Sequence, residues 1–176
     1  MAAVWARRHG ITFERPLVVW GKEARFPKIE NLGGTIALGR GVTFAGARVP
    51  VFLGVGERGV LTVGDGAFLN EAANIYARSR VEIGARTLIA NFVCVMDTNM
   101  HEIEANGGVT TEPVTIGENV WLGLGSIVLP GVTIGDNTVV AAGSVVVESL
   151  PADVLAAGNP ARVKRSIHAP DGWFRR

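Results

Sequence analysis

A six-residue period in residues 116–151 is the feature that most limits how this chain can fold. Divided into sixes, the stretch reads IGENVW, LGLGSI, VLPGVT, IGDNTV, VAAGSV and VVESLP. The first position is aliphatic in every hexad, and the fifth is always small, β-branched or aliphatic. An α-helix cannot keep this register, and simple alternation along a strand does not explain why glycine recurs at the second position.

This period predicts a parallel β-solenoid, in which each hexad forms a short strand and a turn and three hexads close one triangular coil. The first position fills the interior, and the fifth lies near a corner where a bulky side chain does not fit. We expect glycine at the second position to relieve a turn of unusual φ. One coil cannot bury its apolar face alone, so the coils stack at about the 4.8 Å spacing of neighbouring strands.

The same frame returns upstream, with irregularities. It fits residues 63–74 and 83–100, and IYARSRVE at 75–82 carries two extra residues at a corner. The main break is HEIEANGGVTTEP at 101–113, which must leave the prism as a loop. Insertions on a solenoid often form its functional face.

The predicted organisation is therefore a single all-β domain. Its segments are an irregular N-terminal cap at 1–37, β-helix coils at 38–155 and a short non-repetitive tail at 156–176.

Composition excludes several classes of protein. The formal net charge is +1, which gives no electrostatic footprint for nucleic acid. Cys94 is the single cysteine, so no intrachain disulfide can form and a reducing compartment is expected. No apolar run is long enough to span a bilayer, and the N-terminus lacks the apolar core of a secretory signal. We expect a cytoplasmic protein that neither inserts into a membrane nor binds nucleic acid.

Residues 113–165 resemble the C-terminal half of hexapeptide-repeat acetyltransferases, in particular the galactoside/maltose O-acetyltransferase and polysaccharide O-acetyltransferase group. The segments VWLG, LPGVTIG, AAGSVV and AAGNPAR carry this resemblance, in that order. It implies a left-handed parallel β-helix, a homotrimer, and acetyl-CoA as acyl donor in a crevice between two subunits. The period itself fixes neither the trimer nor the handedness, and the general rule for parallel crossovers favours the right hand.

His101 stands where this family has its catalytic histidine, just before the loop. By resemblance, it would remove a proton from an acceptor hydroxyl, whose oxygen then attacks the thioester carbonyl of acetyl-CoA. Imidazole suits this role because it can accept and return a proton near neutral pH. From the residues alone, His101 could instead be a solvated loop residue.

The resemblance also implies residues that bind the acceptor. Asn70 matches a sugar-contacting asparagine, although asparagine also suits a corner with left-handed backbone. Asp97 could orient the imidazole, bind a sugar hydroxyl or form a turn, and Asn99 is a further candidate of this kind. Arg78 replaces an acidic residue of the galactoside enzymes, so it is either a surface arginine or a contact for an acceptor with negative charge.

A third set is implied for the donor. Trp121 matches a tryptophan beside the pantetheine arm, and it could also lie in a subunit interface. Small residues at a corner would let pantetheine approach backbone groups closely. Arginines in the tail would bind the adenosine phosphates through paired hydrogen bonds, or they would form only a solvated basic tail. These residues are Ala142, Gly143, Ser144, Arg162 and Arg165.

The predicted function is an acetyl-CoA-dependent O-acetyltransferase that acts on a sugar or glycan. Two alternatives stay open: an N-acetyltransferase of an amino sugar or sugar nucleotide, and a non-catalytic solenoid that binds a partner. A zinc hydro-lyase on the same fold would need three converging histidines, and the other two, His9 and His168, lie outside the repeat. No metal site is therefore expected.

Overall fold

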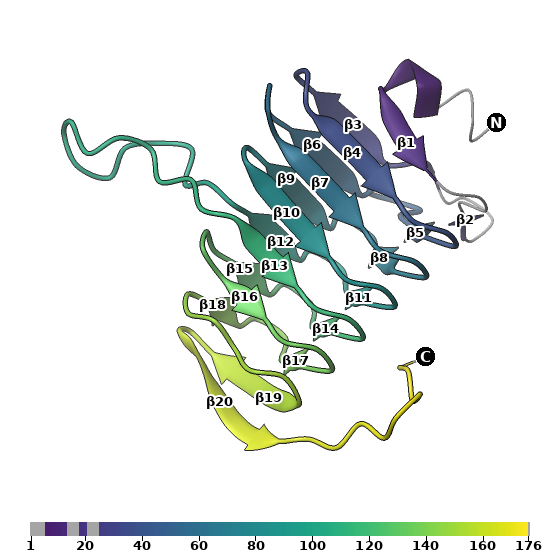
Figure 1. Cartoon of the computed structure of the whole chain (residues 1–176), viewed down its shortest axis with the longest axis vertical. Helices are drawn as coiled ribbons and strands as arrows, with labels where there is room; N and C mark the ends of the chain where they lie inside the picture. Colours follow the sequence, from purple (N-terminus) through teal and green to yellow (C-terminus); the bar gives the residue numbers. More distant parts are fainter. Residues whose placement is uncertain (1–5, 14–17, 21–24, 176) are drawn as a thin grey trace.

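The computed structural model describes residues 6–13, 18–20 and 25–175, and its strands form the three sides of a triangular prism (Figure 1). Sheet one contains β1 (Ile11–Phe13), β4 (Thr35–Leu38), β7 (Val60–Val63), β10 (Arg80–Ile83), β13 (Val114–Ile116) and β16 (Thr133–Ile134). Sheet two contains β2 (Val18–Val19), β5 (Thr43–Ala45), β8 (Phe68–Asn70), β11 (Leu88–Ile89), β14 (Trp121–Leu122), β17 (Val139–Val140), β19 (Val154–Gly158) and β20 (Ala161–Ser166). Sheet three contains β3 (Lys28–Asn31), β6 (Phe52–Val55), β9 (Asn74–Ala77), β12 (Cys94–Met96), β15 (Ile127–Val128) and β18 (Val145–Val146).

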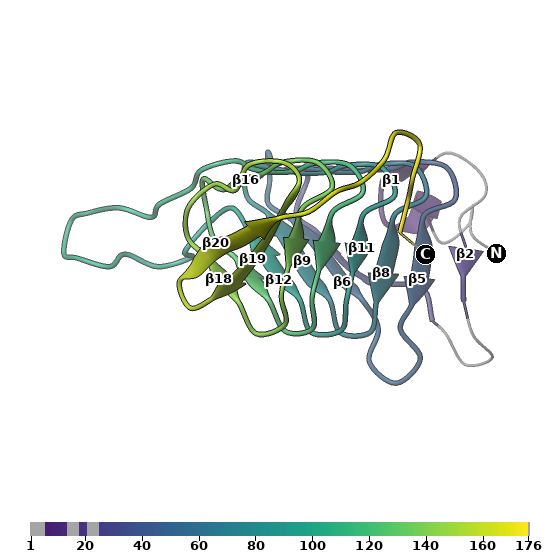
Figure 2. The same cartoon turned by 90° about the horizontal axis from the view of Figure 1, so that it is seen from below.

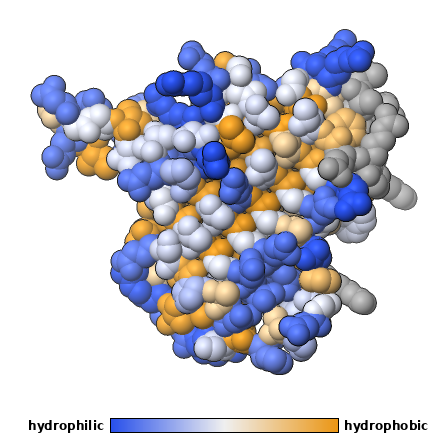
Figure 3. Space-filling model, viewed as in Figure 1, coloured by the Kyte–Doolittle hydropathy of each residue, from blue (hydrophilic) through white to orange (hydrophobic). Residues whose placement is uncertain are grey.

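Parallel pairing between successive coils confirms the predicted solenoid. In the regular repeat, strand residues pair with their counterparts three hexads later, as Leu122 does with Val140 and Val128 with Val146. The helix is left-handed, as the resemblance implied. Over sheet one, Figure 3 shows rows of hydrophobic and nearly neutral residues, with hydrophilic residues mostly at the margins. Within the described part of the chain, no helix is long and apolar enough to cross a membrane.

The interior of the prism contains the residues that the hexad predicts. All six first positions of residues 116–151 are at most 1% exposed, and all six fifth positions are at most 6% exposed. Fully burying one such aliphatic side chain stabilises a fold by about 1.5–3 kcal/mol. The largest buried side chain, Phe44, extends this core into the N-terminal coils.

The glycines at the second position have a different cause from the predicted one. Gly123 does not have a positive φ, and a Cβ atom built there would lie 2.6 Å from the nitrogen of Ala142 and 2.7 Å from the oxygen of Val140. The left-handed residues occupy the fourth position of the hexad instead, for example Asn119 and Gly125. Second-position glycine therefore permits close stacking of coils, and the prediction that it relieves an unusual φ was wrong.

The solenoid starts before residue 38, so the predicted cap at 1–37 is too long. Strands β1, β2 and β3 pair in parallel with β4, β5 and β6, and they extend all three sheets upstream. The period could not be recognised in the sequence of this end coil, because the residues of β3 alternate between exposed and half-buried positions and none of them is buried. Residues 1–5, 14–17 and 21–24 of the predicted cap lie outside the described residues.

The predicted tail begins with another coil. Strand β19 pairs in parallel with β17, and β20 then folds back on β19 as an antiparallel partner. The antiparallel strand closes this end of sheet two.

The predicted loop projects from the prism between β12 and β13 (Figures 1 and 2). Its two arms run antiparallel at the root, where Thr98 faces Thr111 and the amide of Glu112 donates to the carbonyl of Asp97 at 2.8 Å. Ile103, farther out, is 82% exposed. The break in the frame at 101–113 therefore marks the loop, although the arms already separate from the coil after Met96.

Candidate active site

The edge of the prism between sheets three and one holds four of the predicted residues, and we call it the histidine edge: Arg78, Asp97, Asn99 and His101. Asp97 directly follows β12, whose Met96 pairs with Tyr76 of β9, so Asp97 lies beside the corner formed by residues 78–80. The two extra residues of IYARSRVE fall at this corner, between β9 and β10.

Asp97 is fully buried and stabilises that corner. Its Oδ1 accepts a hydrogen bond from the amide of Arg78 at 2.7 Å. Its Oδ2 accepts from the amides of Ser79 at 2.6 Å and Arg80 at 2.7 Å. The three backbone N–H groups of this corner are thereby satisfied. The structure thus gives Asp97 a turn-bracing role, with no hydrogen bond to His101 among the described residues.

His101 follows this buried anchor and lies on the surface. Its backbone amide donates to the carbonyl of Asn99 at 2.7 Å, and its side chain is exposed. The amide nitrogen and oxygen of the Asn99 side chain are buried and make no hydrogen bond to any described residue. The guanidinium of Arg78 is exposed and forms no ion pair within the described chain. The histidine edge therefore combines a rigid corner with unpaired polar side chains.

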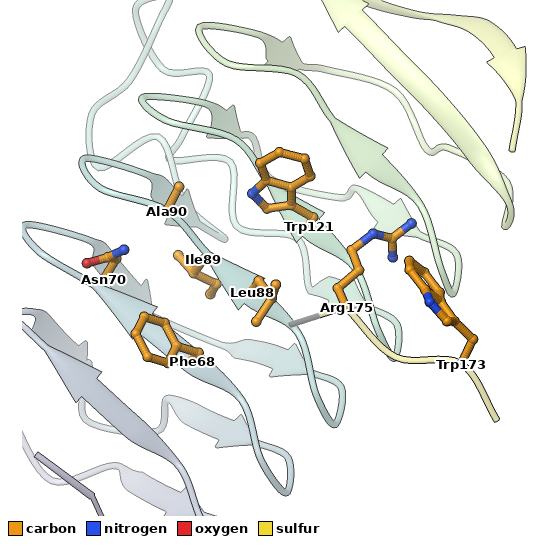
Figure 4. Close-up of a pocket in the computed structure, with 8 residues that line it drawn as sticks. All are labelled: Phe68, Asn70, Leu88, Ile89, Ala90, Trp121, Trp173 and Arg175. Carbon is orange, nitrogen blue, oxygen red and sulfur yellow. The ribbon is translucent and has the colours of Figure 1, made fainter. Parts of the chain in front are cut away.

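A second candidate region is a groove of about 550 Å³ on the outer face of sheet two (Figure 4), which we call the tryptophan groove. Strands β8, β11 and β14 form its floor, and the C-terminal residues form one side. Its lining residues are Phe68, Asn70, Leu88, Ile89, Ala90, Trp121, Trp173 and Arg175. The volume and the largely apolar lining are typical of a small-molecule site.

Asn70 is the amide at the β8 end of the tryptophan groove. Its Oδ1 accepts a hydrogen bond from the amide of Glu71 at 3.0 Å, and no described residue accepts a hydrogen bond from its side-chain NH₂. Glu71 in turn is 7% exposed and binds the amides of Arg48 at 2.6 Å and Val49 at 2.9 Å. The Val49 amide and then the Arg48 side chain lower the pKa of Glu71 below its ordinary value of 4.5. Asn70 therefore lies at a corner that the hydrogen bonds of Glu71 hold in place.

The predicted donor residues lie toward the C-terminal end of the prism. Ser144 is 1% exposed, its hydroxyl accepts from the amide of Gly158 at 3.1 Å, and its carbonyl accepts from Ile127 at 2.8 Å. The amide of Gly143 donates to Leu124 at 2.8 Å. Ala142 and Gly143 are both exposed at this corner, and no described residue binds the carbonyl of Gly143 or the backbone groups of Ala142.

Arg162 and Arg165 are both exposed on β20. Arg162 donates to the carboxylate of Glu148 at 3.0 Å and to the carbonyl of Ala161 at 2.9 Å. The side chain of Arg165 donates only to the carbonyl of Ser166, at 3.2 Å, among the described residues. An anionic ligand would therefore compete with a carboxylate at Arg162 but not at Arg165.

The structure brings Asn70 and Trp121 into one groove, and Arg78, Asp97, Asn99 and His101 to one edge. It does not bring these two sets together within one chain, because the groove lies on sheet two and the edge joins sheets three and one. The other lining residues were not predicted from the sequence: Phe68, Leu88, Ile89, Ala90, Trp173 and Arg175. The period marks Phe68 as an outward-facing residue, but no sequence signal places the C-terminal residues beside it.

Metal ligands are not clustered in the part of the chain that the structure describes, where no group of three or more His, Cys, Asp or Glu could hold an ion.

Comparison with known proteins identifies the family. Residues 113–148 match the model described as the hexapeptide repeat of succinyl-transferase. Galactoside O-acetyltransferase of Escherichia coli (strain K12) is 40% identical over 128 residues, covering 71% of this chain and 62% of that protein. WbbJ of the same organism, provisionally named a lipopolysaccharide biosynthesis O-acetyl transferase, is 33% identical over 163 residues, covering 85% of this chain and 81% of that protein.

The fold agrees with this sequence relationship. A crystal structure of galactoside acetyltransferase in complex with coenzyme A has a TM-score of 0.61 and 32% identity, covering 80% of this chain and 64% of that one. The chain spans less than two thirds of the length of the first curated relatives that it matches. Because the match to WbbJ extends over most of both proteins, the chain belongs to the hexapeptide-repeat acetyltransferases of the galactoside and polysaccharide O-acetyltransferase group.

Proposed function

We propose that the protein transfers an acetyl group from acetyl-CoA to a hydroxyl group of a sugar or glycan, with His101 as the general base. The observation that carries this proposal is the relationship to O-acetyltransferases, which extends over 85% of the chain in the case of WbbJ. The structure supports it with a groove that joins Asn70, expected at the acceptor, to Trp121, expected at the donor.

The chemistry requires an accessible base on a fixed support. The imidazole of His101 is exposed, and its backbone follows the anchored residues Asp97 and Asn99. His101 would accept the proton of the acceptor hydroxyl as that oxygen bonds to the acyl carbon. It would return the proton to the sulfur as the carbon–sulfur bond breaks, so that an acetyl ester and a free thiol result. A positioned base of this kind typically contributes about 10²–10⁴-fold to the rate.

The separation of the histidine edge from the tryptophan groove supports a composite site. In one chain, His101 and Trp121 lie on different parts of the prism. We propose that the protein is a homotrimer in which the His101 loop of one subunit reaches the donor groove of its neighbour. Sedimentation equilibrium would measure the mass of the assembly, and a monomer that retains full activity would contradict this arrangement.

Arg78 supports an acceptor that carries negative charge near the reacting hydroxyl. The guanidinium is exposed, while its backbone is fixed by Asp97. We propose that this cation binds a phosphate or carboxylate of the acceptor. Arg78→Ala should raise the KM of anionic acceptors and leave that of neutral acceptors unchanged, and equal KM values for both classes would exclude the contact.

The test of the function is a thiol-release assay with acetyl-CoA and a panel of neutral sugars, amino sugars, sugar nucleotides and acidic glycans. We expect thiol release with a hydroxyl acceptor and a loss of about 10²–10⁴-fold in kcat for His101→Ala. His168→Ala is the matched control, because His168 is also exposed, does not line the tryptophan groove and is not among the residues of the histidine edge.

Isothermal titration of coenzyme A into both variants separates chemistry from binding. His101→Ala should bind coenzyme A as tightly as the wild type does. Undiminished thiol release by His101→Ala would exclude it as the base, and release only with amino sugars would replace the O-acetyl assignment by N-acetylation.

A further inference from the structure

The last described residues, 173–175, form a strap across the edge between sheets one and two. After β20 the chain turns back along the side of the solenoid on which β11, β14 and β17 lie (Figure 1). The strap is bound by Asn119, which is 2% exposed: its Nδ2 donates to the carbonyl of Trp173 at 3.2 Å, and its Oδ1 accepts from the amide of Arg175 at 3.0 Å.

The side chain of Arg175 makes this attachment stronger. Its guanidinium donates to the carbonyl of Asn119 and, at 2.7 Å, to the carbonyl of Asn137 in the next coil. Asn119 and Asn137 are themselves linked at 2.8 Å, and Asn137 donates to Asp153 at 2.9 Å. The strap is therefore fixed to a ladder of polar side chains that runs along the edge from coil to coil.

Two aromatic contacts set the direction of the strap side chains. The guanidinium of Arg175 lies 5.2 Å from the centre of the Trp173 ring, and that of Arg86 lies 4.0 Å from the centre of the Phe174 ring. Both distances are within the range of cation–π attraction. Phe174 is thereby held toward Arg86, while Trp173 and Arg175 line the tryptophan groove.

The strap and the sheet face each other across that groove. In Figure 4, Trp173 and Arg175 lie on the opposite side of the pocket from Phe68 and Asn70, with Trp121 above the floor residue Leu88. Trp121 and Trp173 are each 45% exposed. Half-exposed indoles on two sides of an apolar floor can cover the surface of a thin apolar ligand.

We propose that the strap is a wall of the donor site, in which Trp173 contacts the pantetheine arm of coenzyme A and Arg175 positions Trp173. This inference rests on the proposed function and assigns two residues to it. Arg175 is a positioning residue, because its two terminal NH₂ groups bind carbonyl oxygens of Asn119 and Asn137. The apolar floor formed by Phe68, Leu88 and Ala90 suits the aliphatic part of pantetheine better than the phosphates.

The experiment measures the dissociation constants of two ligands by isothermal titration to the full chain. Coenzyme A contains the pantetheine arm, and adenosine 3′,5′-bisphosphate lacks it. Trp173→Ala should raise the dissociation constant of coenzyme A by about tenfold, since it removes one aromatic contact. It should leave the dissociation constant of adenosine 3′,5′-bisphosphate unchanged. Trp173→Phe should restore most of the affinity, and Arg175→Ala should reproduce the effect of Trp173→Ala.

Control variants and outcomes separate this inference from the function on which it rests. His168→Ala changes an exposed residue of the same C-terminal segment outside the groove and should not alter either constant. The strap is not a wall for pantetheine if Trp173→Ala changes the dissociation constant of coenzyme A by less than twofold, or if it raises the dissociation constants of both ligands equally. If the wild type does not bind coenzyme A, the proposed function fails as well.

Discussion

Replacing Asp97 tests the account of the histidine edge most directly. The Asp97→Ala change removes a fully buried carboxylate and its three hydrogen bonds, of 2.6–2.7 Å, to the amides of residues 78–80. A hydrogen bond to a charged group contributes about 1.5–3 kcal/mol to the free energy of unfolding. Because the corner is exposed, water can replace part of this bonding, and we expect a loss of about 3–5 kcal/mol.

Two measurements are needed, one global and one local. Urea denaturation at a fixed protein concentration gives the midpoint and its slope, and amide hydrogen exchange reports the protection of residues 78–80. We expect both the midpoint and the protection of these amides to fall. Asp136→Ala is the matched control, since the exposed Asp136 side chain accepts one backbone hydrogen bond, from Glu118 at 2.7 Å, and should cost about 1 kcal/mol.

If Asp97→Ala unfolds at the urea midpoint of the wild type and its corner amides stay protected, the carboxylate does not brace the corner. If stability is kept but His101-dependent acetyl transfer is lost, Asp97 acts in the chemistry, as one reading of the sequence suggested.

Three further predictions concern the solenoid itself. Gly123→Ala should lower the free energy of unfolding by about 2–3 kcal/mol, because its Cβ meets the backbone of the next coil. Gly125→Ala is the control: its φ is 64° and the space around it is open, so it should lower the free energy of unfolding by about 1 kcal/mol. Equal urea midpoints for the two variants would exclude the stacking argument. The Val49 amide lowers the pKa of Glu71, so the contribution of Glu71 to stability is present above pH 4.5 and is lost as the pH falls through the pKa of the folded state. Glu71→Gln should therefore make the melting temperature depend less on pH in that range. An unchanged pH profile would contradict the role of Glu71 in anchoring the corner. Partial burial raises the pKa of the Cys94 thiol, so iodoacetamide at pH 8 should alkylate it more slowly in the folded protein than in urea. Mass spectrometry can measure both rates, and equal rates would contradict this effect of burial.

The repeating part of the fold could be predicted from the sequence because one physical requirement acts at every hexad. Ile116 and Ile134 stand at equivalent positions, so the side chain that fills one coil also predicts the next. The upstream coils were missed because β3 at the open end leaves its residues exposed or half-buried, and its sequence KIEN does not show the period.

The candidate site was predictable only where function lies within the repeat or at its break. Asn70, Trp121 and His101 could be found by matching a frame or a family motif. The role of Asp97 could not, because three amides bind it from a different coil. Trp173 and Arg175 join the groove through Asn119, more than fifty residues earlier in the chain, and a non-repetitive tail gives no sign of such a contact.

The loop at the histidine edge has a consequence for how such a chain can change during evolution. After the loop, β13 returns to β10 with Ile116 opposite Ile83, so the insertion does not shift the register of any coil. Residues can be added or removed at this corner while the buried surface stays the same. The sequence that surrounds the proposed base is thereby free to diversify, and enzymes with different acceptors could arise from one unchanged core.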